Sequence, residues 1–169
     1  EAVDAIVSAR KIYILAARSA SALGIFLNYY FSLIFDKVEL VTTTSKTEIY
    51  EKMFRINEED VFIGISFPRY SKQAVSAMNF AKRKGARGIA LTDSLLSPLA
   101  QQADFVLLAR SDMASVVDSL VAPLSLINAM IVATALKKKD EVSKTFQNLE
   151  EIWDEYEVYE KVEEDPVEA

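Results

Sequence analysis

Residues 60–71 read Asp60-Val-Phe-Ile-Gly-Ile-Ser-Phe-Pro-Arg-Tyr-Ser71. The first half of this stretch is a short apolar run without the alternation of polar and apolar residues that a half-exposed strand shows. Such runs are typical of parallel strands covered by helices on both faces. The second half carries serines, a proline and an arginine and leads into a helical pattern. Together they predict a buried parallel strand that ends in a loop of small hydroxyl and cationic side chains.

Similar apolar runs recur along the chain, and segments with helical periodicity separate them. The expected strands cover residues 11–15, 38–41, 60–65, 88–92 and 105–108. Helices are expected over about 23–34, over 47–54, over about 74–84 and after Asp118, and a short helix is expected within 93–102. The second of these should start near Ser45, and Gly85 should end the third in the left-handed conformation. Short connections between alternating strands and helices favour right-handed crossovers. The expected fold is therefore of the α/β class, a doubly wound three-layer αβα sandwich with a five-stranded parallel sheet.

The length of 169 residues, about half of them hydrophobic, suits one domain with a sizeable core. We assign residues 1–137 to the sandwich and residues 138–169 to an amphipathic C-terminal helix and acidic tail of the same domain. The apolar stripe of that helix consists of Val142, Phe146, Leu149, Trp153 and Tyr156. From about Val162 the chain is acidic enough to be disordered. Since the first residue is Glu1 and the opening resembles the end of a helix, we expect the chain to continue upstream.

The formal net charge of −6 is concentrated near the C-terminus: residues 137–169 carry five lysines and twelve acidic residues, which leaves the rest at +1. Nucleic-acid-binding surfaces need a basic excess, and only Lys137 to Lys139 form a basic run, which we interpret as the charged last turn of a helix. Strong DNA binding by this chain alone is not expected. The uncharged stretch 119–136 is long enough to be weighed as a membrane span, but Pro123 and several polar residues favour a buried helix or a subunit interface.

The chain contains neither cysteine nor histidine. Disulfides, thiolate chemistry, the commonest general base and the commonest transition-metal ligand are therefore excluded. The four glycines form neither a G-x-G-x-x-G nor a G-x-x-x-x-G-K motif, which argues against dinucleotide and nucleoside triphosphate binding. We expect a cytoplasmic protein without cofactor or metal.

Ligands of open parallel sheets bind beyond the carboxyl ends of the strands, where helix N-termini point their free amides. Three of the expected strands end there in hydroxyl-bearing and cationic residues, a combination that suits a phosphate. The candidate ligand-binding residues are Arg18, Ser19 and Ser21 after the first strand, Ser66, Arg69, Tyr70 and Ser71 after the third, and Thr92 after the fourth. The ordinary alternative is that the hydroxyls are helix caps and the cations are solvated surface charges.

Over roughly residues 1–137 the chain resembles the SIS (sugar isomerase) domains of RpiR-family transcription regulators. The segments that carry this resemblance are Ile12-Tyr-Ile-Leu-Ala-Ala-Arg-Ser19, residues 61–71, Ala90-Leu-Thr-Asp-Ser94 and Ser97-Pro-Leu-Ala100. In the wider SIS family the loop after the third strand often reads S-x-S-G-x-[ST], and its first serine and last hydroxyl grip a sugar phosphate. Ser66 and Ser71 match those positions, whereas Pro68 replaces the second serine and Arg69 the glycine.

The first loop departs further from the family pattern G-x-G-x-S, because Ala16, Arg18 and Ala20 take its positions; Ser19 and Ser21 lie beside the lost serine. The resemblance implies a phosphosugar-binding effector domain without its N-terminal helix-turn-helix part, which would be its only link to DNA. It also implies a homodimer or homotetramer. Aromatic residues at helical spacing can form the contact or simply pack in the core; they are Phe26, Tyr29, Tyr30 and Trp153.

Two other functions must be compared with a sensor. A sugar-phosphate isomerase needs a base beside the carbonyl carbon, and without histidine the best-placed carboxylate is Glu48, which is equally explained as a solvated first-turn glutamate. A receiver-like or flavodoxin-like domain would need clustered aspartates at strand ends, where only Asp93 lies, as expected of a turn or cap residue. We therefore expect a sensor that does not turn its ligand over.

Overall fold

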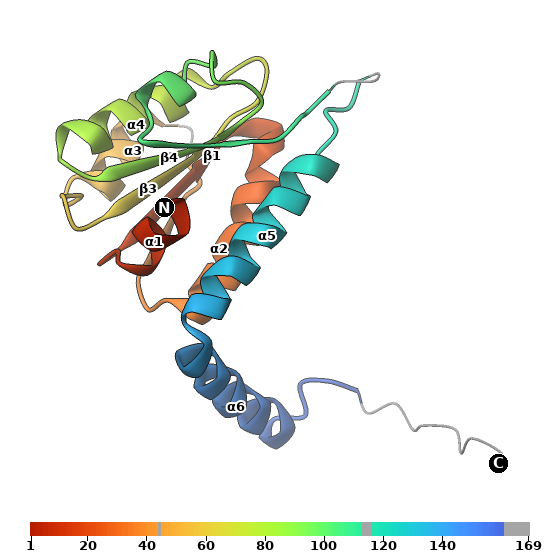
Figure 1. Cartoon of the computed structure of the whole chain (residues 1–169). Coiled ribbons are helices and arrows are strands. Elements are labelled where there is room, and N and C mark those ends of the chain that lie inside the picture. Colours follow the sequence, from red (N-terminus) through yellow and green to blue (C-terminus); the bar gives the residue numbers. More distant parts are fainter. Residues whose placement is uncertain (44, 113–115, 161–169) are drawn as a thin grey trace.

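The computed structural model of the chain describes residues 1–43, 45–112 and 116–160, in which helices and strands alternate (Figure 1). The strands are β1 (Ile12–Ala16), β2 (Val38–Val41), β3 (Val61–Ile65), β4 (Arg87–Thr92) and β5 (Phe105–Leu108). The α-helices are α1 (Ala2–Val7), α2 (Ser21–Ile34), α3 (Lys46–Met53), α4 (Lys72–Arg83), α5 (Val121–Lys137) and α6 (Lys139–Glu155), and short 3-10 helices are η1 (Arg18–Ala20) and η2 (Ala100–Gln102).

The five strands form one parallel sheet in the order β2-β1-β3-β4-β5. Each strand boundary lies within one residue of the position expected from the sequence, and Gly85 has the expected positive φ of 88°. The chain moves from β1 outward to β2 and then returns to place β3 on the other side of β1. The strand order therefore reverses between β1 and β3, and connections leave these two strands in opposite directions.

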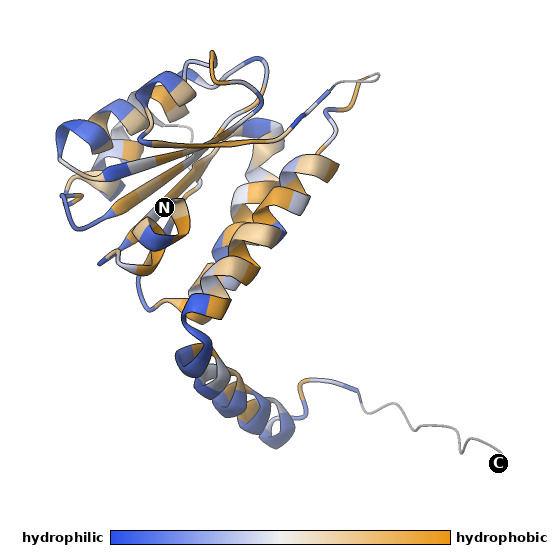
Figure 2. Ribbon diagram, viewed as in Figure 1, coloured by the Kyte–Doolittle hydropathy of each residue, from blue (hydrophilic) through white to orange (hydrophobic). Residues whose placement is uncertain are grey.

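Helices cover both faces of the sheet, as the doubly wound prediction requires. On one face α1, α2 and α5 pack against a cluster that includes Ile14, Ile63 and Phe31. On the other face α3 and α4 pack against a second cluster around Phe62 and Met78. Because successive strand residues point to opposite faces, β1 and β3 supply both clusters and are buried along their whole length. Figure 2 shows these central strands as the most hydrophobic part of the chain.

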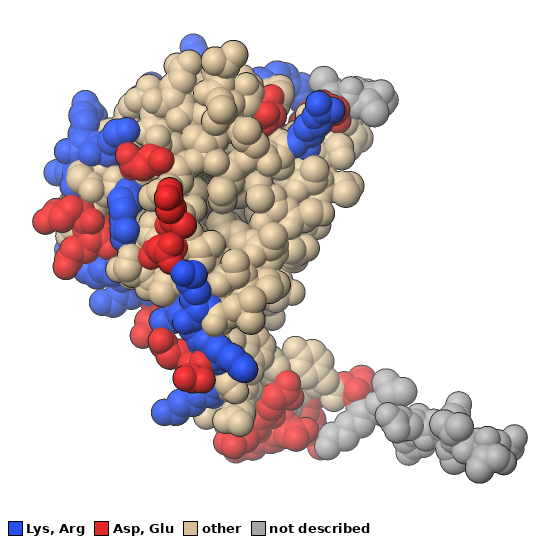
Figure 3. All heavy atoms as spheres, viewed as in Figure 1, with Lys and Arg blue, Asp and Glu red and all other residues tan. Residues whose placement is uncertain are grey.

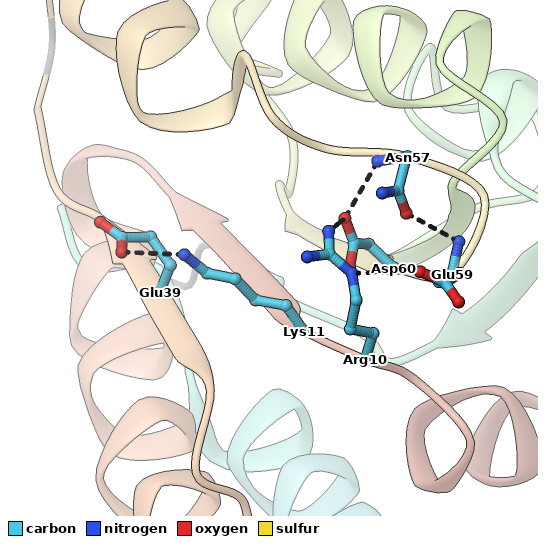
Figure 4. Close-up of polar contacts among 6 residues, drawn as sticks. All are labelled: Arg10, Lys11, Glu39, Asn57, Glu59 and Asp60. Atoms are coloured by element: carbon cyan, nitrogen blue, oxygen red, sulfur yellow. Dashed lines mark hydrogen bonds and ion pairs between the residues drawn. The ribbon is translucent and has the colours of Figure 1, made fainter.

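Polar contacts at the amino ends of the strands fix the start of β3 against β1 (Figure 4). Arg10 Nη2 donates to Asp60 Oδ2 at 2.7 Å, and the Asn57 N–H donates to the same oxygen at 2.9 Å. The Asp60 side chain is fully buried, and its hydrogen bond raises the pKa of Arg10 above the ordinary value. Beside it, Lys11 pairs with Glu39 of β2 at 3.4 Å. These contacts fix the amino ends of the strands whose following connections leave in opposite directions.

The uncharged stretch 119–136 lies largely within α5, which packs beside α2 (Figure 1). The inward side of α5 is buried, as expected for a core helix, and consists of Pro123, Ile127, Met130, Ile131 and Thr134. Its outward side exposes Val121, Val132 and Leu136. Within the described part of the chain no single helix is long and apolar enough to cross a bilayer; α5 and α6 together reach that length only across a bend of 99°.

The expected amphipathic C-terminal helix is present as α6, which projects from the sandwich and has no buried residue (Figure 1). The prediction that Lys137 to Lys139 close one helix is wrong beyond Lys137. Lys137 ends α5 and pairs with Asp4 of α1, Lys138 lies at the bend and pairs with Glu141, and Lys139 begins α6. The bend divides the lysine run between two helices. The predicted disorder from Val162 onward falls outside the described residues.

Candidate functional site

A pocket opens at the carboxyl ends of β1 and β3, where the strand order reverses. Its walls come from three segments that lie far apart in the sequence: the loop after β1, the loop after β3, and the residues before α5. The lining residues are Ala17, Arg18, Ser19, Ala20, Ser66, Phe67, Pro68, Arg69, Ser71, Ser111, Asp118 and Leu120. This is the position at which open parallel sheets bind ligands.

The loop after β3 is held by its own serines. The Ser66 side chain is 4% exposed, and its Oγ accepts a hydrogen bond from the Ser71 N–H at 2.9 Å. Ser71 is the N-cap of α4, and its Oγ accepts from the Ala74 N–H at 3.3 Å. The capping interpretation is thus correct for Ser71, yet both serines also line the pocket. Each hydroxyl can still donate its own proton, and the positive end of the twelve-residue helix α4 faces the same space.

Two arginines at the pocket adopt a backbone conformation that side chains rarely tolerate. Arg18 has φ 59° and Arg69 has φ 69°; among the residues that the structure describes, only Glu157 shares this feature without being glycine. Such a conformation costs of order 1–3 kcal/mol for a residue with a Cβ. Both arginines occupy positions at which the SIS pattern has glycine, which adopts this conformation without strain. The chain thus retains two guanidinium groups at the pocket despite an unfavourable backbone.

The carboxylate of Asp118 reaches into the pocket from the segment before α5. Arg69 Nη2 donates to both of its oxygens, at 3.3 Å and 3.1 Å, and Ser19 Oγ donates to Oδ2 at 3.1 Å. The side chain of Asp118 is 18% exposed, against 67% for Arg69. Nearby, Ser111 Oγ donates to the Ser119 carbonyl oxygen at 3.0 Å, which ties this segment together. Sequence reasoning missed Ser111 and Asp118, because neither lies in a motif or beside a predicted strand end of the site.

The structure brings five of the eight candidate residues into the pocket lining: Arg18, Ser19, Ser66, Arg69 and Ser71. The other three are not among the lining residues. Ser21 begins α2, and Tyr70 and Thr92 meet Asp93 instead, whose Oδ1 accepts from Tyr70 Oη at 2.9 Å and from Thr92 Oγ1 at 3.3 Å. Burial and then this hydrogen bond raise the pKa of Tyr70. Thr92 is fully buried, so it supports the loop after β4.

The carboxylate suggested as an isomerase base is not among the residues that line the pocket. Glu48 is exposed in the first turn of α3. Asp118 is the acidic residue in the lining, and its oxygens already accept hydrogen bonds from Arg69 and Ser19. The arrangement offers donors and positive charge to an anion, namely two guanidinium groups, three serine hydroxyls of the candidate set and the start of α4.

Comparisons with known proteins agree with this architecture. A family model for the SIS domain matches residues 5–133. A helix-turn-helix-type transcriptional regulator of Caldanaerobacter subterraneus is 28% identical over 158 residues, which cover 90% of this chain and 55% of the regulator. The chain therefore spans about half the length of this relative.

Among solved structures, the sugar isomerase domain of an RpiR transcription factor from Sphaerobacter thermophilus is similar with a TM-score of 0.83 and 25% identity, covering 89% of this chain and 83% of that one. The NanR protein of Vibrio vulnificus, solved in complex with ManNAc-6P, has a TM-score of 0.75 at 18% identity, covering 90% and 58%; a likeness at this identity shows the fold alone. The matched family model extends over most of the sandwich, and the chain belongs to the SIS domain family.

Proposed function

We propose that this chain is the phosphosugar-sensing effector domain of an RpiR-type transcription regulator, and that a helix-turn-helix part of the same protein reads DNA in the cytoplasm. The observation that carries the proposal is the pocket at the reversal of strand order, where Arg18 and Arg69 meet the serine-capped start of α4. Guanidinium groups, hydroxyls and helix-start amides are the donors that phosphate monoesters prefer. A ligand held by these groups contacts both β1 and β3 loops at once.

The relatives support the phosphosugar class and the regulatory setting. The matched regulator of Caldanaerobacter subterraneus is of the helix-turn-helix type, and the chain covers only about half of it. NanR of Vibrio vulnificus binds ManNAc-6P on the same fold. In the proposed mechanism the ligand binds one arrangement of the regulator more tightly than another, and a difference of about 1–3 kcal/mol between them is sufficient to change DNA affinity.

We propose binding without turnover. Moving a proton between the two carbons of an enediol requires a base within hydrogen-bond reach of the substrate. The lining carboxylate, Asp118, is engaged by a guanidinium and a hydroxyl, and Glu48 lies elsewhere on α3. Among the described residues, the pocket lining therefore contains no carboxylate that is free of hydrogen-bond donors.

The proposal is tested by a thermal-shift screen against ManNAc-6P, glucose 6-phosphate, fructose 6-phosphate and their unphosphorylated sugars, followed by isomerisation assays on every compound that stabilises the protein. Binding to the native state raises Tm. We expect a phosphorylated sugar, and not its free sugar, to raise Tm without being converted. Conversion would show an isomerase instead, and no response to any phosphosugar would contradict the assignment of the pocket.

A matched pair of serine variants separates ligand contact from helix capping. Ser71 and Ser97 both accept a hydrogen bond from a helix-start N–H, but only Ser71 lines the pocket. Ser71→Ala and Ser97→Ala should each cost about 1 kcal/mol of stability, because each removes the acceptor of a backbone N–H. Ser71→Ala should abolish the ligand-induced rise in Tm, and so should Ser66→Ala as a separate variant. Ser97→Ala should keep it. If the ligand raises the Tm of Ser71→Ala and Ser97→Ala equally, Ser71 does not contact the ligand.

We further propose that two copies associate through the outward face of α2 and α5, as a homodimer or as half of a homotetramer. Its exposed apolar residues include Ile25, Tyr29, Val121, Val132 and Leu136. Few charged atoms lie over α2 and α5 in the view of Figure 3, and acidic ones gather on α6. A large apolar patch of this kind is unusual on a monomer and typical of subunit contacts. The apolar stripe of α6, which projects beyond its own sandwich with no buried residue, offers a partner copy the matching surface.

A further inference from the structure

We propose that Asp118 is an internal anion that competes with the ligand: its carboxylate holds Arg69 and Ser19 in the empty pocket, and a bound phosphate displaces it. This inference rests on the proposed function of the pocket and concerns how that same site is regulated.

The contacts of Asp118 are those expected of a bound anion. It accepts from Arg69 through both carboxylate oxygens, at 3.3 Å and 3.1 Å, and from Ser19 Oγ at 3.1 Å. The two donors come from the loops after β1 and β3, so the carboxylate bridges the two walls of the pocket. A guanidinium and a hydroxyl are also the groups that a phosphate would use. The Ser19 hydroxyl has a single proton and Arg69 Nη2 already donates to the carboxylate, so a phosphate that takes these same donors must displace Asp118.

The charge of Asp118 opposes phosphate binding in the wild-type pocket. Its lining contains two cations, Arg18 and Arg69, and the single carboxylate of Asp118. A phosphate monoester that enters next to the carboxylate meets a like charge at short range, and in a partly buried site that repulsion is only partly screened. A phosphate that takes the Nη2 donors of Arg69 therefore requires Asp118 to give up its ion pair. The affinity of the site is lowered by the cost of breaking that pair.

Displacement of Asp118 would also act beyond the pocket. Leu120, two residues later, packs against the apolar cluster beneath α2 and α5, and α5 begins at Val121. The outward faces of α2 and α5 form the proposed contact between copies. A ligand that moves Asp118 therefore biases the start of a helix that contributes to this surface, as coupling between two sites requires.

The experiment compares wild type with Asp118→Asn, which keeps the size of the side chain and removes its charge. Inorganic phosphate and ManNAc-6P are titrated into each protein by calorimetry. We expect Asp118→Asn to bind inorganic phosphate about 5- to 100-fold more tightly than wild type, the range of ordinary coupling free energies. The matched control is Asp112→Asn, an exposed acid of the same segment outside the pocket lining, which should bind as wild type does.

If Asp118→Asn binds phosphate no more tightly than wild type does, the inference is overturned, because Asp118 then either has no effect on binding or contacts the ligand. The proposed function would still be supported by the binding of phosphate compounds to wild type. If neither protein binds any phosphate compound, the proposed function fails as well. Hydrogen exchange gives a second measurement in unmutated protein. Saturating phosphate should speed exchange of peptide 116–124; slower exchange there would show that the ligand recruits Asp118 instead of releasing it.

Discussion

At the scale of single residues, Arg18 and Arg69 show a conflict between backbone and side chain. Each has a positive φ, a conformation that suits glycine, at a position where the SIS pattern has glycine. An arginine at such a position lowers the stability of the protein through backbone strain and adds a positive charge at the pocket. Strain of this kind is found preferentially at functional sites, where a group must be held in one place.

The strain leads to a prediction about two variants of Arg69. Arg69→Gly should be more stable than Arg69→Ala by about 0.5–1 kcal/mol, because alanine keeps a Cβ in the left-handed region and glycine does not. Both variants lack the guanidinium, so both should lose phosphosugar binding to the same degree. Urea unfolding measures the first difference and ligand thermal shift the second.

Two results would contradict this account of Arg69. If the alanine variant is as stable as the glycine variant, the backbone at this position is not strained. If either variant keeps wild-type affinity for the phosphosugar that stabilises the protein, the guanidinium is not part of the binding site.

At the scale of elements, contacts between the ends of helices hold the layers in place. Lys137 in the last turn of α5 pairs with Asp4 in the first turn of α1, and both helices lie on the same face of the sheet. Each charge also suits its helix end, since a carboxylate at an N-terminus and an ammonium at a C-terminus interact favourably with the helix dipole. The pair thus connects the beginning of the described chain to the helix that precedes the bend into α6.

This ion pair predicts a dependence of stability on acid. The hydrogen bond and the charge of Lys137 lower the pKa of Asp4 below its ordinary value. Because the folded pKa is below the unfolded one, the contribution is complete above about pH 4 and is lost as pH falls toward 2. We expect the difference in Tm between wild type and Asp4→Asn to shrink over this interval, as followed by circular dichroism. An unchanged difference would show that Asp4 contributes no pH-dependent stability; since the pair is exposed, the effect should be small.

At the scale of the whole molecule, the topology decides where the site and the association surface lie. The reversal of strand order between β1 and β3 creates the pocket, and the crossovers place α2 and α5 side by side on one face. The pocket and the apolar helix face are therefore built on the same pair of layers. The segment around the start of α5 contributes to both, since Asp118 lines the pocket and Val121, the first residue of α5, is exposed on the helix face.

Association through this face is tested by sedimentation velocity. We expect wild type to sediment as a dimer or tetramer, and Ile25→Asp to raise the dissociation constant at least about tenfold because a charge would be buried without a partner. Leu96→Asp is the matched control, since Leu96 is 81% exposed and lies outside α2, α5 and α6. A monomeric wild type, or equal dissociation by both variants, would contradict the proposed surface.

Much of this molecule follows from local patterns. Short apolar runs located all five strands to within one residue, and the central strands β1 and β3 most clearly, because a strand buried on both faces has little choice of composition. Hydroxyls and cations predicted that the loops after β1 and β3 line the pocket, since parallel strands end at the same edge of the sheet, whereas Thr92 after β4, predicted with them, is not among the lining residues. Ser71 caps α4, as the ordinary alternative held, and it also lines the pocket; its contact with a ligand stays a prediction.

Only the tertiary structure decided the rest. Asp118 enters the pocket from 49 residues beyond Arg69, and no local pattern encodes a contact that depends on how α5 returns across the sheet. Thr92 and Tyr70 turn to Asp93 because the loop after β4 lies beyond the reversal point. The lysine run 137–139 is divided by a bend, and its first two members pair with acids on different helices. By itself the sequence determined the elements and the chemistry of their ends, whereas packing between distant segments decided which of those ends meet.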